Sequence, residues 1–233
     1  LGANPATLTT FDGGKAFVAN SVANNLVFVD LTTNATESTL ASPQGSPFFQ
    51  PAVSAGKAYV PADKWADDWS ALVFSGVHVI DLATRKVTKT IELEADANPG
   101  NASVDPSGKV WLGVKNGLIA IDPATDTTVH TLAFGEKVTH VQFLSATKGY
   151  GKVNGGLVSF NPTTGAILKD VAAKIEAEVD GAGAFKIFNG VGYVSSFGKD
   201  TVSVVDLVTE AASGSPISVG DAPQDLTFVT VED

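Results

Sequence analysis

The feature that most constrains the fold of this chain is a short segment that recurs five times along it. The segment joins two apolar runs through a polar, usually glycine-containing turn, which is the sequence pattern of a β-hairpin. The five copies are DGGKAFV at 12–18, SAGKAYV at 54–60, PSGKVWL at 106–112, SATKGYG at 145–151 and FNGVGYV at 188–194. A chain of 233 residues with this pattern is a repeat protein.

The spacing of the copies gives the size of the repeating unit. A unit start lies twelve residues before the aromatic residue of each copy, and a sixth start has no aromatic partner. The starts are Pro5, Pro47, Pro99, Val138, Gly181 and Pro223. Consecutive starts differ by 42, 52, 39, 43 and 42 positions. A period of about 40–50 residues is typical of the blades of a β-propeller.

Each unit contains two further apolar runs after the hairpin. The third run ends in an Asx residue, at Asp30, Asp81, Asp122, Asn161 or Asp206. We interpret these residues as turn formers, because an Asx side chain accepts hydrogen bonds from the backbone that follows it. The fourth runs are ESTL, KTIEL, VHTLAF, ILKDV and SPISV. Four antiparallel strands cannot bury both faces of their own sheet, so neighbouring sheets must stack. We therefore predict an all-β protein, a single β-propeller domain over 1–233.

The repeats resemble the YVTN family of β-propeller repeats. Counterparts of its Tyr-Val-Thr-Asn tetrapeptide lie at 17–20, 59–62 and 193–196, with weaker copies at 111–112 and 150–151. A Gly-x-x-Pro opening recurs at 2–5 and 220–223. The resemblance covers nearly the whole chain and implies a propeller of four-stranded antiparallel blades. The family includes surface proteins, periplasmic binding proteins and lactonase-like enzymes, so it implies no single function.

The sixth unit start leaves the closure of the ring open. Five complete units predict five blades and one leftover C-terminal strand at 223–231, whereas members of the family more often have seven blades. The leftover segment PQDLTFVTV is similar to the first strand of the first unit, PATLTTFDG. We favour closure onto the first blade, because an unpaired strand edge promotes aggregation. The alternatives are pairing with a neighbouring molecule and the beginning of a further blade.

The spacing of 52 positions marks an insertion in the second unit, PADKWADDWSALVFSG at 61–76. It carries Trp65 and Trp69 together with three carboxylates, Asp63, Asp67 and Asp68. Long loops on rigid scaffolds often carry function. Trp faces suit sugars, aromatic ligands or a protein partner, and carboxylates suit Ca²⁺ or ligand hydroxyl groups. The alternative is that both Trp anchor the loop on its blade, and Asp-x-x-x-Asp-Asp lacks the spacing of a known calcium loop.

A second candidate site is a partly polar ring at the propeller axis. Asn101, His140 and Asp225 share one offset from their unit starts with Thr7, and Phe49 and Gly183 hold that offset in the other two units. The alternative is a water-filled channel with no specific ligand. The other two histidines, His78 and His130, fall in third and fourth strands, and we interpret them as packing or solvated residues. The segment AAKIEAEVD at 172–180 predicts a short helix between units four and five.

Composition narrows the class of function. The formal net charge of −10 argues against nucleic acid as a partner. No run of about 18 apolar residues occurs, so we expect no insertion into a membrane. The chain has no Cys, which excludes a disulfide framework. It has no Met and begins at Leu1, so we expect a cleaved export signal and an extracytoplasmic location, in the periplasm, at the cell surface or secreted; a trimmed chain is the alternative.

The sequence contains no signature of catalysis. Gly-x-Ser-x-Gly, Walker, dinucleotide-binding and His-Glu-x-x-His motifs do not occur. We therefore predict a non-enzymatic binding or scaffold propeller that presents loops to a protein or small-molecule partner. One alternative, implied by the resemblance, is a lactonase-like hydrolase with an axial metal site. Another is a structural subunit of a surface layer or filament that self-associates through the C-terminal strand. The sequence requires no cofactor, and Ca²⁺ is the one that its carboxylates suggest.

Overall fold

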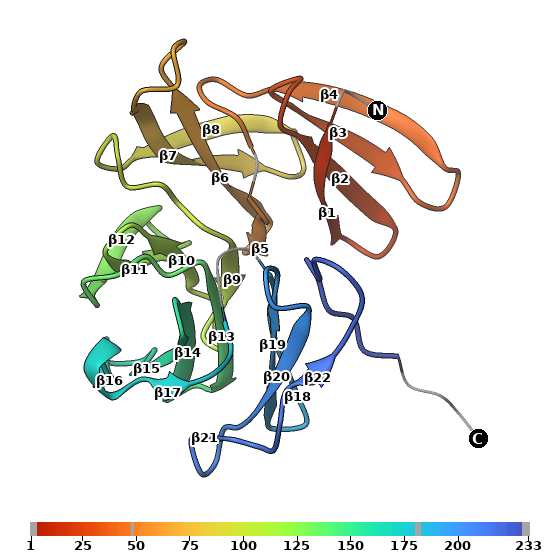
Figure 1. Ribbon diagram of the computed structural model, residues 1–233. Helices are drawn as coiled ribbons and strands as arrows, with labels where there is room; N and C mark the ends of the chain where they lie inside the picture. The colour runs from red at the N-terminus through yellow and green to blue at the C-terminus, as the bar shows by residue number, and fades with distance from the viewer. Residues whose placement is uncertain (1–3, 48, 180–182, 230–233) are drawn as a thin grey trace.

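The computed structural model describes residues 4–47, 49–179 and 183–229, and these residues fold almost entirely into β-strands (Figure 1). Within them the strands form five antiparallel sheets, each with four consecutive strands along its path. We call the sheets blades 1 to 5 in chain order. The predicted fold class is confirmed, since every repeat of the sequence gives one four-stranded blade. The described residues include no helix that is long and apolar enough to cross a membrane.

The strands have the following bounds. Blade 1 contains β1 (Pro5–Phe11), β2 (Lys15–Asn20), β3 (Asn25–Asp30) and β4 (Ala35–Ala41). Blade 2 contains β5 (Ala52–Ser54), β6 (Lys57–Trp65), β7 (Leu72–Asp81) and β8 (Lys86–Glu92). Blade 3 contains β9 (Ala102–Val104), β10 (Val110–Val114), β11 (Gly117–Asp122) and β12 (Thr127–Ala133). Blade 4 contains β13 (His140–Ser145), β14 (Lys148–Val153), β15 (Gly156–Asn161) and β16 (Ala166–Lys169), with β17 (Ile175–Glu176) also paired to β15. Blade 5 contains β18 (Phe185–Phe188), β19 (Val191–Ser196), β20 (Thr201–Asp206) and β21 (Ala211–Ala212), with β22 (Ile217–Ser218) also paired to β20.

The turn after each third strand is fixed by its Asx residue, as predicted. The side-chain oxygen accepts a hydrogen bond from a backbone N–H two or three residues further on, at 2.7 to 2.9 Å for Asp30, Asp81, Asp122, Asn161 and Asp206. The repeated Asx residues therefore serve the turn in every blade.

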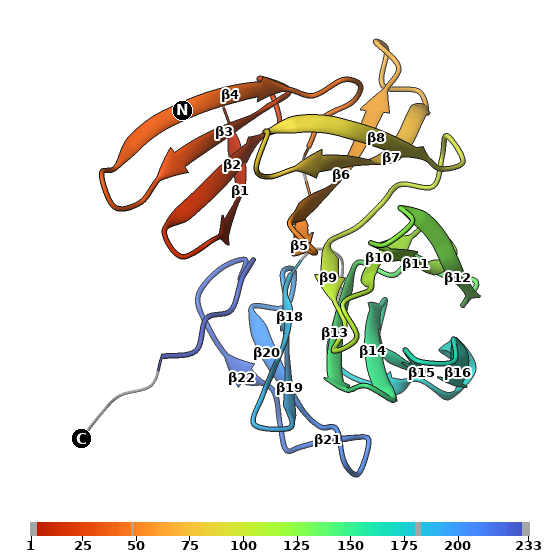
Figure 2. The same ribbon diagram turned by 180° about the vertical axis from the view of Figure 1, so that it is seen from behind.

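The core of the protein lies between neighbouring blades. In four of the five repeated segments the aromatic residue is fully buried in the interface between its own blade and the next: Phe17 between blades 1 and 2, Tyr59 between blades 2 and 3, Trp111 between blades 3 and 4, and Tyr150 between blades 4 and 5. Tyr193 of the fifth segment is partly buried. Figures 1 and 2 show the consequence, an arc of blades with their first strands toward its centre. The innermost strand of blade 2, β5, begins at Ala52, five residues after the predicted unit start.

The C-terminal segment does not close the ring onto blade 1. Residues 223–229 form no strand, and Phe228 packs against Phe188 and Tyr193 of blade 5, with ring centroids 4.6 and 5.1 Å apart. Phe143 of blade 4 lies at the same offset from its unit start as Phe228 does from Pro223. Its ring contacts that of Trp111 in the preceding blade, with centroids 6.3 Å apart. The segment thus occupies the place of a following blade's first strand.

The expected closure is wrong over residues 223–229, because blade 1 takes all four of its strands from its own segment and Phe228 packs on blade 5 instead. Among the residues that the structure describes, no hydrophobic cluster joins blade 5 to blade 1. Residues 230 and 231 of the predicted strand, and the predicted unit start at 181, lie outside the described residues. Pairing of this segment with a neighbouring molecule stays a prediction.

The predicted helix at 172–180 is wrong over the described residues. A single 3₁₀ turn, η1 (Val171–Ala173), is capped by Asp170, whose side chain accepts a hydrogen bond from the N–H of Ala173. The chain then extends into β17, which buries Ile175 in the core between blades 4 and 5. Packing of one apolar residue against the sheet therefore outweighs the helical propensity of this alanine-rich segment.

Replacement of Trp111 tests the role of the repeated aromatic residue. Its indole N–H donates to Asp105 at 2.9 Å, and its ring lies 4.7 Å from that of Phe160. We expect Trp111→Ala to lower the free energy of unfolding by about 3–5 kcal/mol, because it leaves a large cavity. Trp69→Ala is the matched control, since that ring is 74% exposed, and it should change stability by less than about 0.5 kcal/mol. Equal urea midpoints for the two variants would contradict this account.

Candidate functional site

The insertion in the second unit lengthens a hairpin of blade 2. Residues predicted as a loop extend β6 and β7, which stay paired as far as Trp65 and Leu72, and the hairpin tip projects beyond the blade (Figure 1). The tip is closed by a hydrogen bond from the N–H of Ala66 to the carbonyl of Ala71 at 2.8 Å. Asp68 stabilises the turn by accepting from the N–H and hydroxyl of Ser70 at 3.0 and 2.6 Å. The Trp-bearing segment is therefore an ordered projection.

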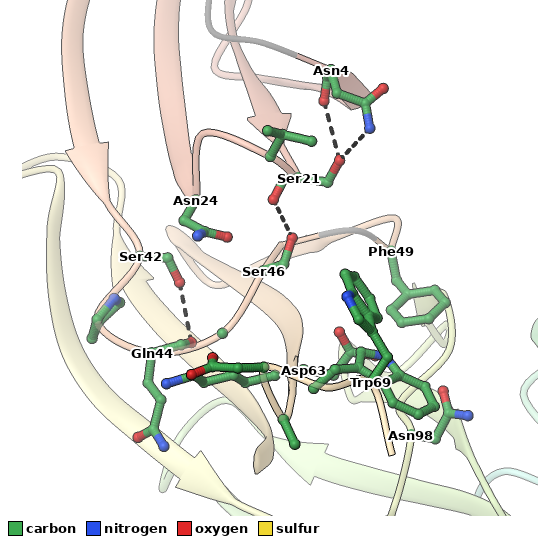
Figure 3. A pocket seen from close by; sticks show the side chains of 17 residues that line it. Asn4, Ser21, Asn24, Ser42, Gln44, Ser46, Phe49, Asp63, Trp69 and Asn98 are labelled. Atoms are coloured by element: carbon green, nitrogen blue, oxygen red, sulfur yellow. Dashed lines mark hydrogen bonds between the residues drawn. The ribbon is translucent and has the colours of Figure 1, made fainter. Parts of the chain in front are cut away.

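A cavity of about 980 Å³ lies between this hairpin and the turns of blade 1 (Figure 3). We call it the hairpin cleft. Trp65, Trp69 and Phe49 line it on one side. The other polar lining side chains are mostly amides, hydroxyls and carboxylates, with one cation: Asn4, Ser21, Asn24, Ser42, Gln44, Ser46, Asp63, Asp67, Asn98 and Lys64. The cleft therefore combines aromatic faces with many uncharged hydrogen-bonding groups.

The two Trp side chains form an exposed pair. Their ring centroids are 6.3 Å apart and their planes are inclined by 33°. Trp65 is 39% exposed and Trp69 is 74% exposed. Trp69 therefore does not anchor the hairpin on its blade, which was the alternative to a functional role. The Nζ of Lys137 lies over the Phe49 ring, 5.5 Å from its centroid.

Asp63 lies at the base of the cleft and is 8% exposed. Its backbone exchanges two hydrogen bonds with Ser46, at 2.6 and 3.3 Å, which fixes the linker between blades 1 and 2 against β6. Gly45 permits this approach, because a Cβ there would lie 2.6 Å from the Asp63 carbonyl oxygen. Burial raises the pKa of the Asp63 carboxyl, and the charge of Lys137 partly opposes the shift. Within the described part of the chain, no side chain or backbone N–H donates to this carboxylate.

The three carboxylates of the insertion do not converge. Asp63 is buried at the base of the cleft, Asp67 is exposed at its edge, and Asp68 is engaged by Ser70. Among residues 4–47, 49–179 and 183–229, no group of three His, Asp or Glu side chains is arranged to hold a metal ion. The geometry therefore gives no support to the Ca²⁺ that the acidic composition of the insertion suggested.

Several lining residues were not predicted from the sequence. Asn24 lies in the turn between β2 and β3, and Gln44 lies in the linker to blade 2. Each sits in an ordinary polar turn. The one available signal was positional: the β2–β3 turn of blade 1 and the β6–β7 insertion of blade 2 are equivalent in the repeat, and equivalent turns of adjacent blades lie at the same end of a propeller.

The axial candidates are only partly brought together. Asn101 donates from Nδ2 to Nε2 of His140 at 2.7 Å, and its Oδ1 accepts from the N–H of Gln50 at 2.9 Å. Gln50 in turn donates to Thr9 at 2.8 Å, so the network crosses blades 1 to 4. Asp225 stays outside it, with a 74% exposed side chain that lies 3.7 Å from Lys186.

The three histidines have structural surroundings. Burial, and then the charges of Lys152 and Lys186, lowers the pKa of His140 to about 3, so the ring is neutral near pH 7. His78 is 1% exposed, lies 2.7 Å from the carbonyl oxygen of Gln44, and so holds the linker beside the cleft. His130 stacks on Trp111 with centroids 5.6 Å apart. Of the two interpretations for His78 and His130, packing or solvated residues, the contacts of both rings favour packing.

The buried state of His140 predicts a dependence of stability on acid. Its folded pKa of about 3 lies below the unfolded value of 6.5, so the unfolded chain binds the proton first. Stability should therefore fall as the pH is lowered from about 6 to 4.5, by up to about 1.4 kcal/mol per pH unit from this residue. His140→Gln keeps an acceptor for Asn101 but cannot bind the proton, so its free energy of unfolding, measured with urea, should depend less steeply on pH. All other titrating groups are common to the two proteins and cancel in the comparison. Parallel slopes would contradict the assignment.

Comparison with known proteins identifies the fold and no family. No family model and no curated protein matches the chain. It is similar in structure to catalytically inactive virginiamycin B lyase from Staphylococcus aureus with quinupristin, at TM-score 0.72 and 12% identity, over 95% of this chain and 73% of that chain. A chain of the mitotic checkpoint complex gives TM-score 0.73 and 12% identity, over 94% and 66%. The calcium-binding protein regucalcin from Agrobacterium tumefaciens gives TM-score 0.59 and 19% identity, over 97% and 77%. At these identities the likeness shows a β-propeller fold, and it does not confirm the YVTN family.

Proposed function

We propose that this protein is a non-enzymatic binding module whose ligand occupies the hairpin cleft. The observation that carries the proposal is the exposed pair of Trp65 and Trp69 beside a cavity of about 980 Å³. Folding does not require this pair, since the interfaces between blades are filled by other aromatic residues. Aromatic side chains that remain exposed over a polar cavity are a feature of ligand sites.

The axial site gives less support to the lactonase-like alternative. A metal-dependent hydrolase would need a cation near His140, the histidine of the axial ring. Two positive charges, on Lys152 and Lys186, act on that histidine, and Asn101 already donates to its Nε2. Both features disfavour a metal ion there. The binding proposal needs no charged ligand at the axis, where the polar network connects the blades.

The proposal includes a location outside the cytoplasm and a protein or small-molecule partner. The absence of Cys and Met and the net charge of −10 are compatible with an exported protein. A similar fold occurs in a chain of the mitotic checkpoint complex, and propellers therefore do act within protein assemblies. Small ligands are favoured over large partners here, because the aromatic and polar groups converge in a cavity.

An array of uncharged glycans, acidic glycans and peptides tests the proposal. We expect the wild-type protein to retain at least one class of probe, and the double variant Trp65→Ala/Trp69→Ala to lose tenfold or more in affinity. Phe197→Ala is the control, because Phe197 is also 39% exposed and lies in blade 5, away from the cleft. Retention that is equal in the double variant and the control, or no retention of any probe, would sink the proposal.

A further inference from the structure

We infer that the ligand of the hairpin cleft is an uncharged carbohydrate, with a sugar ring stacked on Trp69 and a hydroxyl group hydrogen-bonded to Asp63. The inference rests on the proposed function and adds the chemical class of the ligand. It joins three features of the cleft: a large exposed indole face, a buried acceptor with no protein donor, and a lining of amides and hydroxyls.

The indole face suits the apolar face of a sugar ring. Trp69 is 74% exposed and lies over the cleft, while Trp65 supports it from the neighbouring strand end at a centroid distance of 6.3 Å. Asp68 fixes the turn that carries Trp69, and the residue itself has a left-handed φ of 60°. Because the turn is ordered, little backbone conformational entropy is lost when a sugar ring stacks on the indole.

The buried carboxylate suits a hydroxyl donor. Asp63 is more than nine-tenths buried, lines the cleft, and receives no hydrogen bond from the described residues. Because Asp63 lines the cleft, a ligand in the cleft can donate to its carboxylate. Hydrogen bonds from hydroxyl groups to a carboxylate are short and strong.

The remaining lining groups suit hydroxyl groups and disfavour anions and metal ions. Asn24, Gln44 and Asn98 offer both donors and acceptors, which matches hydroxyl groups that are themselves both. An anionic ligand would meet the carboxylates of Asp63 and Asp67, against one lining cation, Lys64. Lys137, half-buried beside the cleft, is already engaged, since its Nζ donates to Asn98 Oδ1 at 2.7 Å. A metal ion is disfavoured, because the described residues contain no group of three His, Asp or Glu side chains arranged to hold one.

Titration calorimetry with defined probes tests the inference. The probes are the uncharged oligosaccharides maltohexaose, cellohexaose and chitohexaose, the acidic oligogalacturonate, and a proline-rich peptide. We expect at least one uncharged oligosaccharide to bind, with tenfold or greater loss for Trp69→Ala, partial retention for Trp69→Phe, and at least threefold loss for Asp63→Asn. Val73→Thr is the matched control on the same hairpin, because Val73 is 50% exposed on β7, does not line the cleft and should leave affinity unchanged.

The outcomes separate the ligand class from the proposed function. Binding of oligogalacturonate or of the peptide alone, with loss in Trp69→Ala, overturns the carbohydrate inference and leaves the binding module standing. Binding of an uncharged oligosaccharide that Trp69→Ala does not weaken places the sugar elsewhere and also overturns the inference. No binding of any probe, together with a negative array, overturns both. Circular dichroism spectra of all variants should overlay, so that loss of binding is not loss of fold.

Discussion

The structure depends on one contact, the insertion of each blade's repeated aromatic residue into the interface with the next blade. A four-stranded sheet leaves two apolar faces, and only a neighbouring sheet can cover them. Phe17, Tyr59, Trp111 and Tyr150 make this contact with no exposed surface. Tyr193 makes it with Phe228 of the C-terminal segment. Stability is therefore distributed over successive neighbour contacts, as in other repeat proteins.

The hairpin cleft exists because this framework is rigid. Blades 1 and 2 are joined by a buried cluster, so their turns at one end are held at a fixed separation. Backbone hydrogen bonds between Ser46 and Asp63 pair the linker between these blades with β6. A contact between the His78 ring and the carbonyl oxygen of Gln44 also fixes the linker. The extended β6–β7 hairpin then supplies the second wall. A cavity results from two turns and a linker, none of which contributes to the interfaces between blades.

The fold was predictable and the site was partly predictable, for different physical reasons. Pairing of neighbouring strands and the Asx turns depend on residues that are close in sequence, so the repeated segments predicted both. Trp65 and Trp69 were found because they interrupt the repeat. Asn24 and Gln44 could not be found, since they meet the cleft only through packing of separate blades. Closure of the ring by 223–231 was wrong over the described residues, because the similarity of this segment to the first strand of blade 1 does not show which sheet the segment packs against.

The separation of the cleft from the cores between blades has an evolutionary consequence. Gly45 and Asp63 set the position of the linker, whereas Trp65 and Trp69 at the hairpin tip are exposed and lie outside the core clusters between blades. Substitutions on the hairpin tip can therefore alter specificity while leaving the blades intact. The same scaffold can acquire new preferences through mutations in one short hairpin, which is how a repeat architecture diversifies without refolding.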